Sequence, residues 1–160
     1  MLVLTACGYH NPNIYSGPKK VIYLQNWKNR TSELGLDSSM YRSLVRWYQN
    51  SGSISITKDR EGADLILAGE IVSISLPSLS YGSDNSATEV KIWLKVRYVM
   101  KDLSTDTIIF EQPGETWSEN YLTGGSTADT KANQRKALET IVDDLSEKIY
   151  QKTIARMQAM

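Results

Sequence analysis

Apolar and polar side chains alternate most regularly between residues 88 and 101. One parity is apolar from Val90 to Met100, while the other carries mainly charged side chains. Because successive side chains of a strand lie on opposite faces, this pattern predicts one long strand with a buried and an exposed face. A strand of this length needs long partners, and segments 65–76 and 107–117 supply them on either side. We therefore predict a three-stranded meander as the scaffold of the fold.

Upstream of the meander, the pattern predicts a strand, a helix and a second strand. Residues 21–24 are apolar, and residues 53–57 alternate between isoleucine and hydroxyl side chains. Between them, apolar residues recur every three or four positions over residues 38–50, with Asp37 as the expected N-cap of the helix. A helix that joins two strands of one sheet makes a right-handed crossover, so these two strands should be parallel.

A second, longer helix is predicted near the C-terminal end of the sequence. Ser126 and Asp129 have the spacing of a capping box. An apolar stripe then continues for about 25 residues, which is longer than the average helix. In the segment before it, Pro113 and Gly114 should cause a bulge in an edge strand. The expected fold class is α+β, with two helices packed on one face of a mixed sheet of four to five strands.

The segment 77–87 is predicted to be a polar surface loop. It is too long for a tight hairpin turn. Its apolar exceptions, Leu79 and Tyr81, have two interpretations: they cover the end of the sheet, or they contact a partner.

The first residues, 1–7, are typical of the end of a bacterial lipoprotein signal peptide. Residues 4–7 read Leu-Thr-Ala-Cys and resemble a lipobox, in which Cys7 would become the lipidated N-terminus of the mature protein. A complete signal peptide needs a cationic start and 7 to 15 apolar residues, so we expect the natural chain to begin further upstream. A buried structural cysteine is the alternative. Residues 8–18 should form a tether, which leaves residues 19–160 as a single domain.

Composition argues against several classes of function. The 160 residues carry no net charge, which disfavours bulk nucleic-acid binding, and contain no apolar run that could span a membrane. One cysteine and one histidine cannot form an internal disulfide or the usual zinc site. His10 lies in the expected tether, which disfavours a nucleophilic triad. We therefore expect no metal and no cofactor apart from a covalent lipid on Cys7.

The charged parity of the long strand carries the most unusual polar feature of the sequence. Lys91, Lys95 and Arg97 share this parity, with Trp93 between them. Residues two apart on a strand face lie about 7 Å apart, so these cations form a row that can bind phosphates or sugar acids. The alternative is that the charges only protect the sheet face from aggregation.

A second candidate chemistry is glycoside hydrolysis, which needs a pair of carboxylic acids. Four glutamates on the predicted strands could supply such a pair: Glu70, Glu89, Glu111 and Glu115. The simpler interpretation is that these carboxylates are solvated on the outside of the sheet.

Several short motifs resemble, in the same order along the chain, those of one protein family. They are residues 4–7 (Leu-Thr-Ala-Cys), 8–10 (Gly-Tyr-His), 29–31 (Asn-Arg-Thr), 63–65 (Ala-Asp-Leu), 69–71 (Gly-Glu-Ile), and Tyr98 with Lys101, Asp102 and Leu103. On these motifs the chain resembles the LptE family of lipopolysaccharide-assembly lipoproteins over nearly its whole length.

This resemblance implies a non-enzymatic lipoprotein, anchored to the periplasmic face of the outer membrane by acyl chains such as palmitate on Cys7. Gly8 fits this location, because an aspartate in that position is associated with retention in the inner membrane. The family also implies that the protein binds and plugs LptD, a large β-barrel, and contacts lipopolysaccharide during its transport. No nucleic-acid partner is expected.

Residue roles follow from combining this resemblance with the strand pattern. The expected lipopolysaccharide-binding residues are Lys91, Trp93, Lys95 and Arg97. The expected contacts to the barrel are Leu79 and Tyr81. Two alternatives stay open: an envelope lipoprotein enzyme that acts on glycans, and an adaptor of the same fold for another envelope partner.

Overall fold

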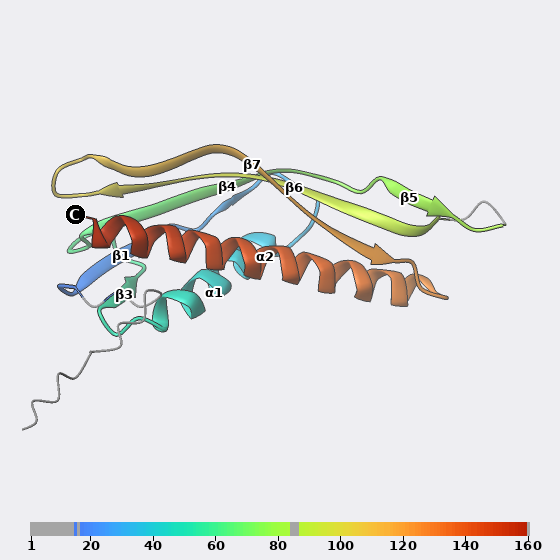
Figure 1. The fold of residues 1–160 in the computed structure, drawn as a ribbon, viewed down its shortest axis with the longest axis horizontal. Helices are drawn as coiled ribbons and strands as arrows, with labels where there is room; N and C mark the ends of the chain where they lie inside the picture. The colour runs from blue at the N-terminus through green and yellow to red at the C-terminus, as the bar shows by residue number, and fades with distance from the viewer. Residues whose placement is uncertain (1–14, 16, 84–86, 160) are drawn as a thin grey trace, which may run out of the picture.

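The computed structural model describes residue 15 and residues 17–83 and 87–159, which form a sheet and two helices (Figure 1). A single buried cluster joins both helices to the apolar face of the sheet, so the helices cover that face, as predicted. The elements in chain order are β1 (Lys20–Leu24), β2 (Lys28–Asn29), α1 (Leu36–Gln49), β3 (Ile54–Thr57), β4 (Leu65–Ser75), β5 (Ser78–Tyr81), β6 (Ala87–Asp102), β7 (Ile108–Leu122) and α2 (Thr127–Gln158).

The N-terminal segment is described only in part. The predicted lipidation site, Cys7, and almost all of the predicted tether lie outside the described residues. Tyr15 is described and buried, and its carbonyl oxygen accepts a hydrogen bond from Ser51 Oγ at 3.2 Å. Packing against the domain therefore extends at least as far as Tyr15.

Strand β6 is the longest strand and organises the sheet. It has 16 residues, so the long strand predicted over residues 88–101 is confirmed. Its apolar side chains from Val90 to Met100 are buried beneath the helices. One edge of β6 pairs with β4 and then with β5, while the other edge pairs with β7 over nearly its whole length.

The N-terminal part of the sheet is parallel. Strand β1 pairs in parallel with both β3 and β4, which confirms the parallel pairing predicted for segments 21–24 and 53–57. Helix α1 lies in the connection from β1 to β3 and packs against α2. The sheet is therefore mixed, because β4 pairs with β6 in the antiparallel direction.

The sheet has seven strands, so the predicted number of four to five was wrong. Strand β5 lies within the segment 77–87 that was predicted to be a loop. The pairing of β4 with β6 ends at Trp93. After Pro77 the chain forms β5, which pairs with residues 87–90 on the same edge of β6. Strand β2 adds two residues beside β4. Strands β2 and β5 form because the longer strands beside them have backbone groups that would otherwise be unpaired. The local sequence pattern of a short segment does not indicate such pairing.

The helix ends differ in detail from the prediction. Helix α1 is N-capped by Gly35, with φ 82°, and not by Asp37, which lies in its first turn. The left-handed conformation suits glycine, because it has no Cβ. The capping box of α2 is confirmed: Ser126 Oγ accepts a hydrogen bond from the backbone N–H of Asp129 at 3.1 Å. Helix α2 has 32 residues, more than the predicted length, because buried side chains recur up to Met157.

Strand β7 is an edge strand with the predicted bulge. Its pairing with β6 steps from Glu115 opposite Val96 to Gln112 opposite Tyr98, so Pro113 and Gly114 both face one residue. Proline lacks the N–H that a central strand must donate, so its place at an edge is expected.

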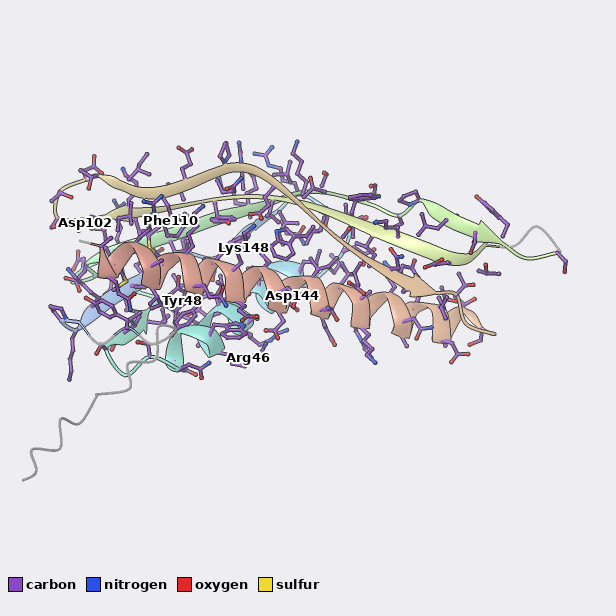
Figure 2. The ribbon with its side chains drawn as sticks, viewed as in Figure 1. Arg46, Tyr48, Asp102, Phe110, Asp144 and Lys148 are labelled. Atoms are coloured by element: carbon purple, nitrogen blue, oxygen red, sulfur yellow. The ribbon has the colours of Figure 1, made fainter. Side chains whose placement is uncertain are left out.

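A polar contact fixes α1 against α2. The carboxylate of Asp143 accepts hydrogen bonds from Ser43 Oγ at 3.0 Å and Trp47 Nε1 at 2.9 Å, and it pairs with Arg46. Burial acts to raise the pKa of Asp143, but these hydrogen bonds outweigh burial and lower it. Figure 2 labels Arg46 on α1 and, on α2, Asp144, which is the residue that follows Asp143.

Replacing this carboxylate should loosen the contact between the helices. We expect Asp143→Ala to lower the free energy of unfolding by about 1 kcal/mol, because three donors of α1 lose their acceptor on a half-exposed surface. Urea denaturation followed by circular dichroism measures this loss. The exposed Asp144→Ala is the matched control, and equal losses in both variants would show that the contact does not stabilise the domain.

Candidate functional site

Strand β6 presents the four predicted lipopolysaccharide-binding residues on the face opposite the helices. We call this the outer face, and we call Lys91, Lys95 and Arg97 the cationic row. These residues and Trp93 alternate with side chains that are fully buried, and Trp93 itself is 40% exposed. The structure therefore brings the four side chains to one solvent-facing surface.

Two members of the cationic row are unpaired. Lys91 Nζ lies 4.5 Å from the ring centroid of Trp93, a distance at which a cation is attracted to an aromatic face. The residues directly opposite Lys95 on the neighbouring strands are Ser73 and Thr116, which are uncharged. Neither lysine forms an ion pair with any other residue that the structure describes.

Arg97 differs from the two lysines because it is paired with Glu70 on β4. Glu70 lies directly opposite Arg97, and its carboxylate forms ion pairs with both Arg97 and Arg30. The side chain of Glu70 is only 7% exposed, whereas those of Arg30 and Arg97 are 61% and 54% exposed. Two guanidinium groups thus cover a buried carboxylate. The sequence pattern did not indicate a role for Arg30, because the position of this residue depends on the short pairing of β2 with β4.

The arginines keep Glu70 ionised. Burial acts to raise the pKa of its carboxyl, but hydrogen bonds from Arg30 and Arg97 outweigh burial and hold the pKa below its usual value. An acid catalyst for glycoside hydrolysis needs the opposite shift, a raised pKa that keeps its proton near neutral pH. Glu70 is therefore unsuited to that role.

Two of the other candidate carboxylates make contacts within the sheet. Glu115 accepts a hydrogen bond from the hydroxyl of Tyr98 at 2.9 Å, and Glu89 accepts one from Asn120 Nδ2 at 3.1 Å. Glu111 is exposed. These contacts give Glu89 and Glu115 a structural role in joining β6 to β7.

A shallow hollow of about 380 Å³ lies on the outer face beside Glu70, and we call it the outer hollow. It spans the segment after β1 and strands β2, β4, β6 and β7. The polar side chains that line it are Gln25, Asn26, Lys28, Glu70, Arg97, Glu111 and Gln112. It therefore adjoins the end of the cationic row at Arg97.

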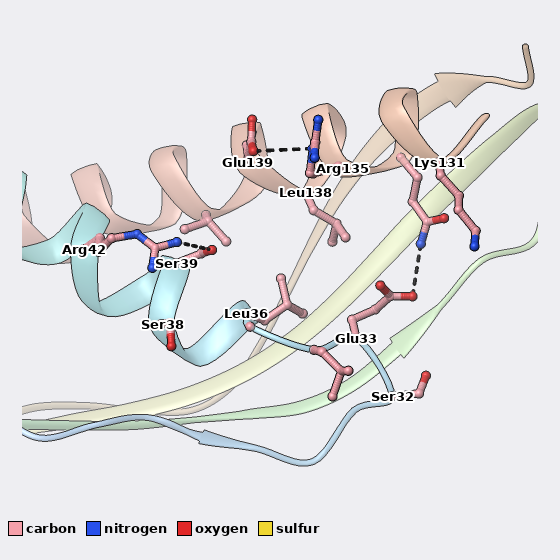
Figure 3. A pocket seen from close by; sticks show the side chains of 14 residues that line it. Ser32, Glu33, Leu36, Ser38, Ser39, Arg42, Lys131, Arg135, Leu138 and Glu139 are labelled. Atoms are coloured by element: carbon pink, nitrogen blue, oxygen red, sulfur yellow. Dashed lines mark hydrogen bonds and ion pairs between the residues drawn. The ribbon is translucent and has the colours of Figure 1, made fainter. Parts of the chain in front are cut away.

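A larger hollow of about 710 Å³ lies between the start of α1, the N-terminal half of α2 and residues 32–35 (Figure 3). Most of its polar side chains are paired with one another. Gln134 Nε2 donates to Glu33 Oε1 at 3.0 Å, and Arg135 pairs with Glu139 at 4.0 Å. The fully exposed Leu34 lies on its rim. Paired charges and a mixed lining give this hollow no clear preference for an anion.

The predicted partner contacts, Leu79 and Tyr81, lie on β5. They are 48% and 60% exposed, so a large part of each side chain is accessible to a partner. Leu76 and Leu122 are also exposed, on the segments that flank β6 at this end. Exposed apolar side chains that gather in one region indicate an interaction surface.

Neither a metal cluster nor a membrane-spanning helix is found in residues 15, 17–83 and 87–159. No group of three or more His, Cys, Asp or Glu side chains there is arranged to hold a metal ion. No helix in this part of the chain is long and apolar enough to cross a membrane.

The lowered pKa of Glu70 should make its contribution to stability depend on pH. The pKa is lower in the folded than in the unfolded state, so the contribution is complete above the ordinary value of 4.5 and is lost as pH falls from there through the folded-state pKa. We expect Glu70→Gln to destabilise the protein at pH 7 and to have a smaller effect near pH 3. Urea denaturation at both values measures this, and an equal difference at both would contradict it.

Solved structures with this fold come from several bacteria. Lipoprotein B from Nitrosomonas europaea has a TM-score of 0.61 and 14% identity, covering 92% of this chain and 88% of its own. The protein CT253 from Chlamydia trachomatis has a TM-score of 0.61 and 13% identity, covering 89% and 100%. A PelC dodecamer from Paraburkholderia phytofirmans has a TM-score of 0.51 and 15% identity, covering 84% and 88%. At these identities the likeness shows the fold alone.

Sequence comparison supplies the family. A search of curated proteins found no match. The family model LptE, described as lipopolysaccharide-assembly, matches residues 20–153, which include every helix and strand except the last turn of α2. The resemblance read from the short sequence motifs is therefore confirmed, and the chain belongs to the LptE family.

Proposed function

We propose that this protein is an outer-membrane lipoprotein that binds lipopolysaccharide on its outer sheet face while bound to an LptD-type β-barrel. The observation that carries the proposal is the outer face of β6, where Lys91 and Lys95 flank the half-exposed Trp93 and form no ion pair with a described residue. Membership in a family of lipopolysaccharide assembly supports this choice of ligand.

The chemistry of this face suits the phosphorylated part of lipopolysaccharide. Lipid A phosphates are multivalent anions, and ammonium groups bind them through charge-assisted hydrogen bonds. Trp93 offers an apolar surface for a sugar face or an acyl segment. The strand fixes the backbone of these residues in advance, so little conformational freedom is lost on binding. The alternative, a merely solvated sheet face, makes a different prediction for charge reversal.

Reversing the two unpaired charges should abolish most of the binding. We expect Lys91→Glu with Lys95→Glu to weaken lipopolysaccharide binding by about tenfold or more, because each reversal replaces attraction by repulsion. Arg97 is left unchanged, because a glutamate there would face Glu70 and destabilise the sheet. Binding of the wild type should also weaken as salt increases.

The measurement is a titration of lipopolysaccharide into both proteins, with circular dichroism to verify folding. Lys131→Glu with Lys136→Glu on α2 is the matched control, because it changes the net charge equally at exposed helix positions. Equal affinities of wild type and the β6 variant would mean that the outer face only solvates the sheet.

The exposed apolar side chains of β5 are the proposed contacts to the barrel. Leu79 and Tyr81 are large and accessible, as residues that dominate interfaces usually are. We expect Leu79→Ser with Tyr81→Ser to reduce co-purification of a stoichiometric outer-membrane barrel, without lowering the stability of the isolated domain. Ile108→Ser is the control, because Ile108 is also exposed but lies at the start of β7, at the end of the sheet away from β5. Undiminished co-purification would exclude β5 from the interface.

The proposed membrane anchor is a lipid on Cys7. One acyl chain gives only marginal membrane binding, whereas a triacylated cysteine supplies enough apolar chain to hold the protein. We expect a full-length Cys7→Ala protein to leave the outer-membrane fraction in cells that lack the barrel partner. Retention in that fraction would rule out Cys7 as the anchor.

Each of the two alternatives predicts a different experimental result. An adaptor of the same fold would co-purify with a partner other than a large barrel. The fold is shared with PelC, a structure of which is a dodecamer. A glycan-cleaving enzyme would lose turnover on replacement of a single glutamate. The lowered pKa of Glu70 makes this residue unsuited to be the acid of such an enzyme.

A further inference from the structure

The outer hollow is bounded on one side by a row of three charged residues on three adjacent strands. Lys28 of β2 lies opposite Glu70 of β4, and Glu70 lies opposite Arg97 of β6. Neighbouring strands are about 4.8 Å apart, so the backbones of Lys28 and Arg97 are about 10 Å apart with Glu70 between them. The two cations thus stand on either side of a carboxylate that Arg30 and Arg97 already neutralise.

The side chains of Arg97 and Lys28 differ in how freely they can move. Arg97 is held by Glu70, whose buried carboxylate fixes one edge of the guanidinium and leaves other N–H groups to solvent. Lys28 is exposed and forms no ion pair with any residue in the described part of the chain. One oriented and one adjustable cation form a suitable pair for a phosphate group.

The rest of the hollow has the chemistry of a sugar site. Ala68 and Val99 lie opposite each other in the pairing of β4 with β6 and provide a small apolar floor. Around this floor stand amide and carboxylate side chains, which can donate to and accept from hydroxyl groups. They are Gln25, Asn26, Glu111 and Gln112. The volume of about 380 Å³ is in the range of small-ligand sites.

We propose that the outer hollow binds a phosphorylated sugar, with the phosphate between Lys28 and Arg97 and the sugar ring over Ala68 and Val99. Glu70 is a positioning residue, because it orients Arg97 and does not itself meet the phosphate. The ligand class rests on the proposed function, since lipid A carries phosphorylated sugars. The hollow would then extend the β6 surface by a second subsite across β4 to β2.

The first experiment uses glucose 1-phosphate, glucose and inorganic phosphate as probes, with backbone amide shifts as the readout. We expect glucose 1-phosphate to bind about tenfold more tightly than either fragment, because only it uses both the cations and the floor. Lys28→Gln should weaken its binding about fivefold. Val99→Trp fills the hollow without changing any charge and should weaken binding about tenfold or more. Lys131→Gln on α2 is the control and should bind like the wild type.

Three results would overturn the inference. The first is that glucose 1-phosphate does not bind the wild type, and the second is that it binds the wild type and Val99→Trp equally. The third is that inorganic phosphate binds as tightly as glucose 1-phosphate, which would leave an anion site without a sugar site. Both variants keep Glu70 and its arginines, so loss of the buried ion pairs cannot cause the effect.

A second experiment separates this inference from the proposed function. Lipopolysaccharide is titrated into Val99→Trp and into Lys91→Glu with Lys95→Glu. If the charge reversals weaken lipopolysaccharide binding, and Val99→Trp changes the binding of neither lipopolysaccharide nor glucose 1-phosphate, the hollow is no subsite and the proposed function stands. If Val99→Trp loses glucose 1-phosphate while no variant changes lipopolysaccharide binding, the proposed function fails and the hollow remains a phosphorylated-sugar site.

Discussion

Backbone pairing along β6 is the interaction on which the rest of the structure depends. This strand has 16 residues, and backbone groups left unpaired in a folded sheet cost free energy. Strands β4 and β5 together satisfy one edge, and β7 satisfies the other. The ribbon formed by β6 and β7 then has a long apolar face, and the 32 residues of α2 lie along it (Figure 1). The length of one strand thus sets the lengths of its neighbours and of the helix.

The same constraint decides which surface is available for binding. Both helices occupy the apolar face of the sheet, so the charged parity of β6 is left on the face without helices. On that face Lys91 and Lys95 have uncharged neighbours across the strands, whereas Arg97 meets Glu70. At one end of this surface the two lysines form no ion pair within the described part of the chain, and at the other end Arg97 and Glu70 border the outer hollow.

Many of the motif residues that gave the family resemblance have structural roles. The side chain of Asn29 accepts a hydrogen bond from the backbone N–H of Thr31 at 3.0 Å and so fixes the turn after β2. Asp64 accepts one from the backbone N–H of Val21 at 2.7 Å and joins β1 to the start of β4. Asp102 accepts backbone N–H groups of the turn between β6 and β7. Because these motif residues stabilise the fold, their resemblance to the family identifies the fold and not the position of the ligand.

The sequence by itself determined the elements whose periodicity is long and regular: β6, α2 with its capping box, and the bulge at Pro113 and Gly114. It also determined that the cations of β6 share one face, because side chains alternate along any strand. Only the tertiary structure decided that β2 and β5 are strands, that Arg97 meets Glu70 and Arg30, and that a hollow lies beside them. These features depend on the register between segments distant in the chain, and register arises from the packing of the whole sheet.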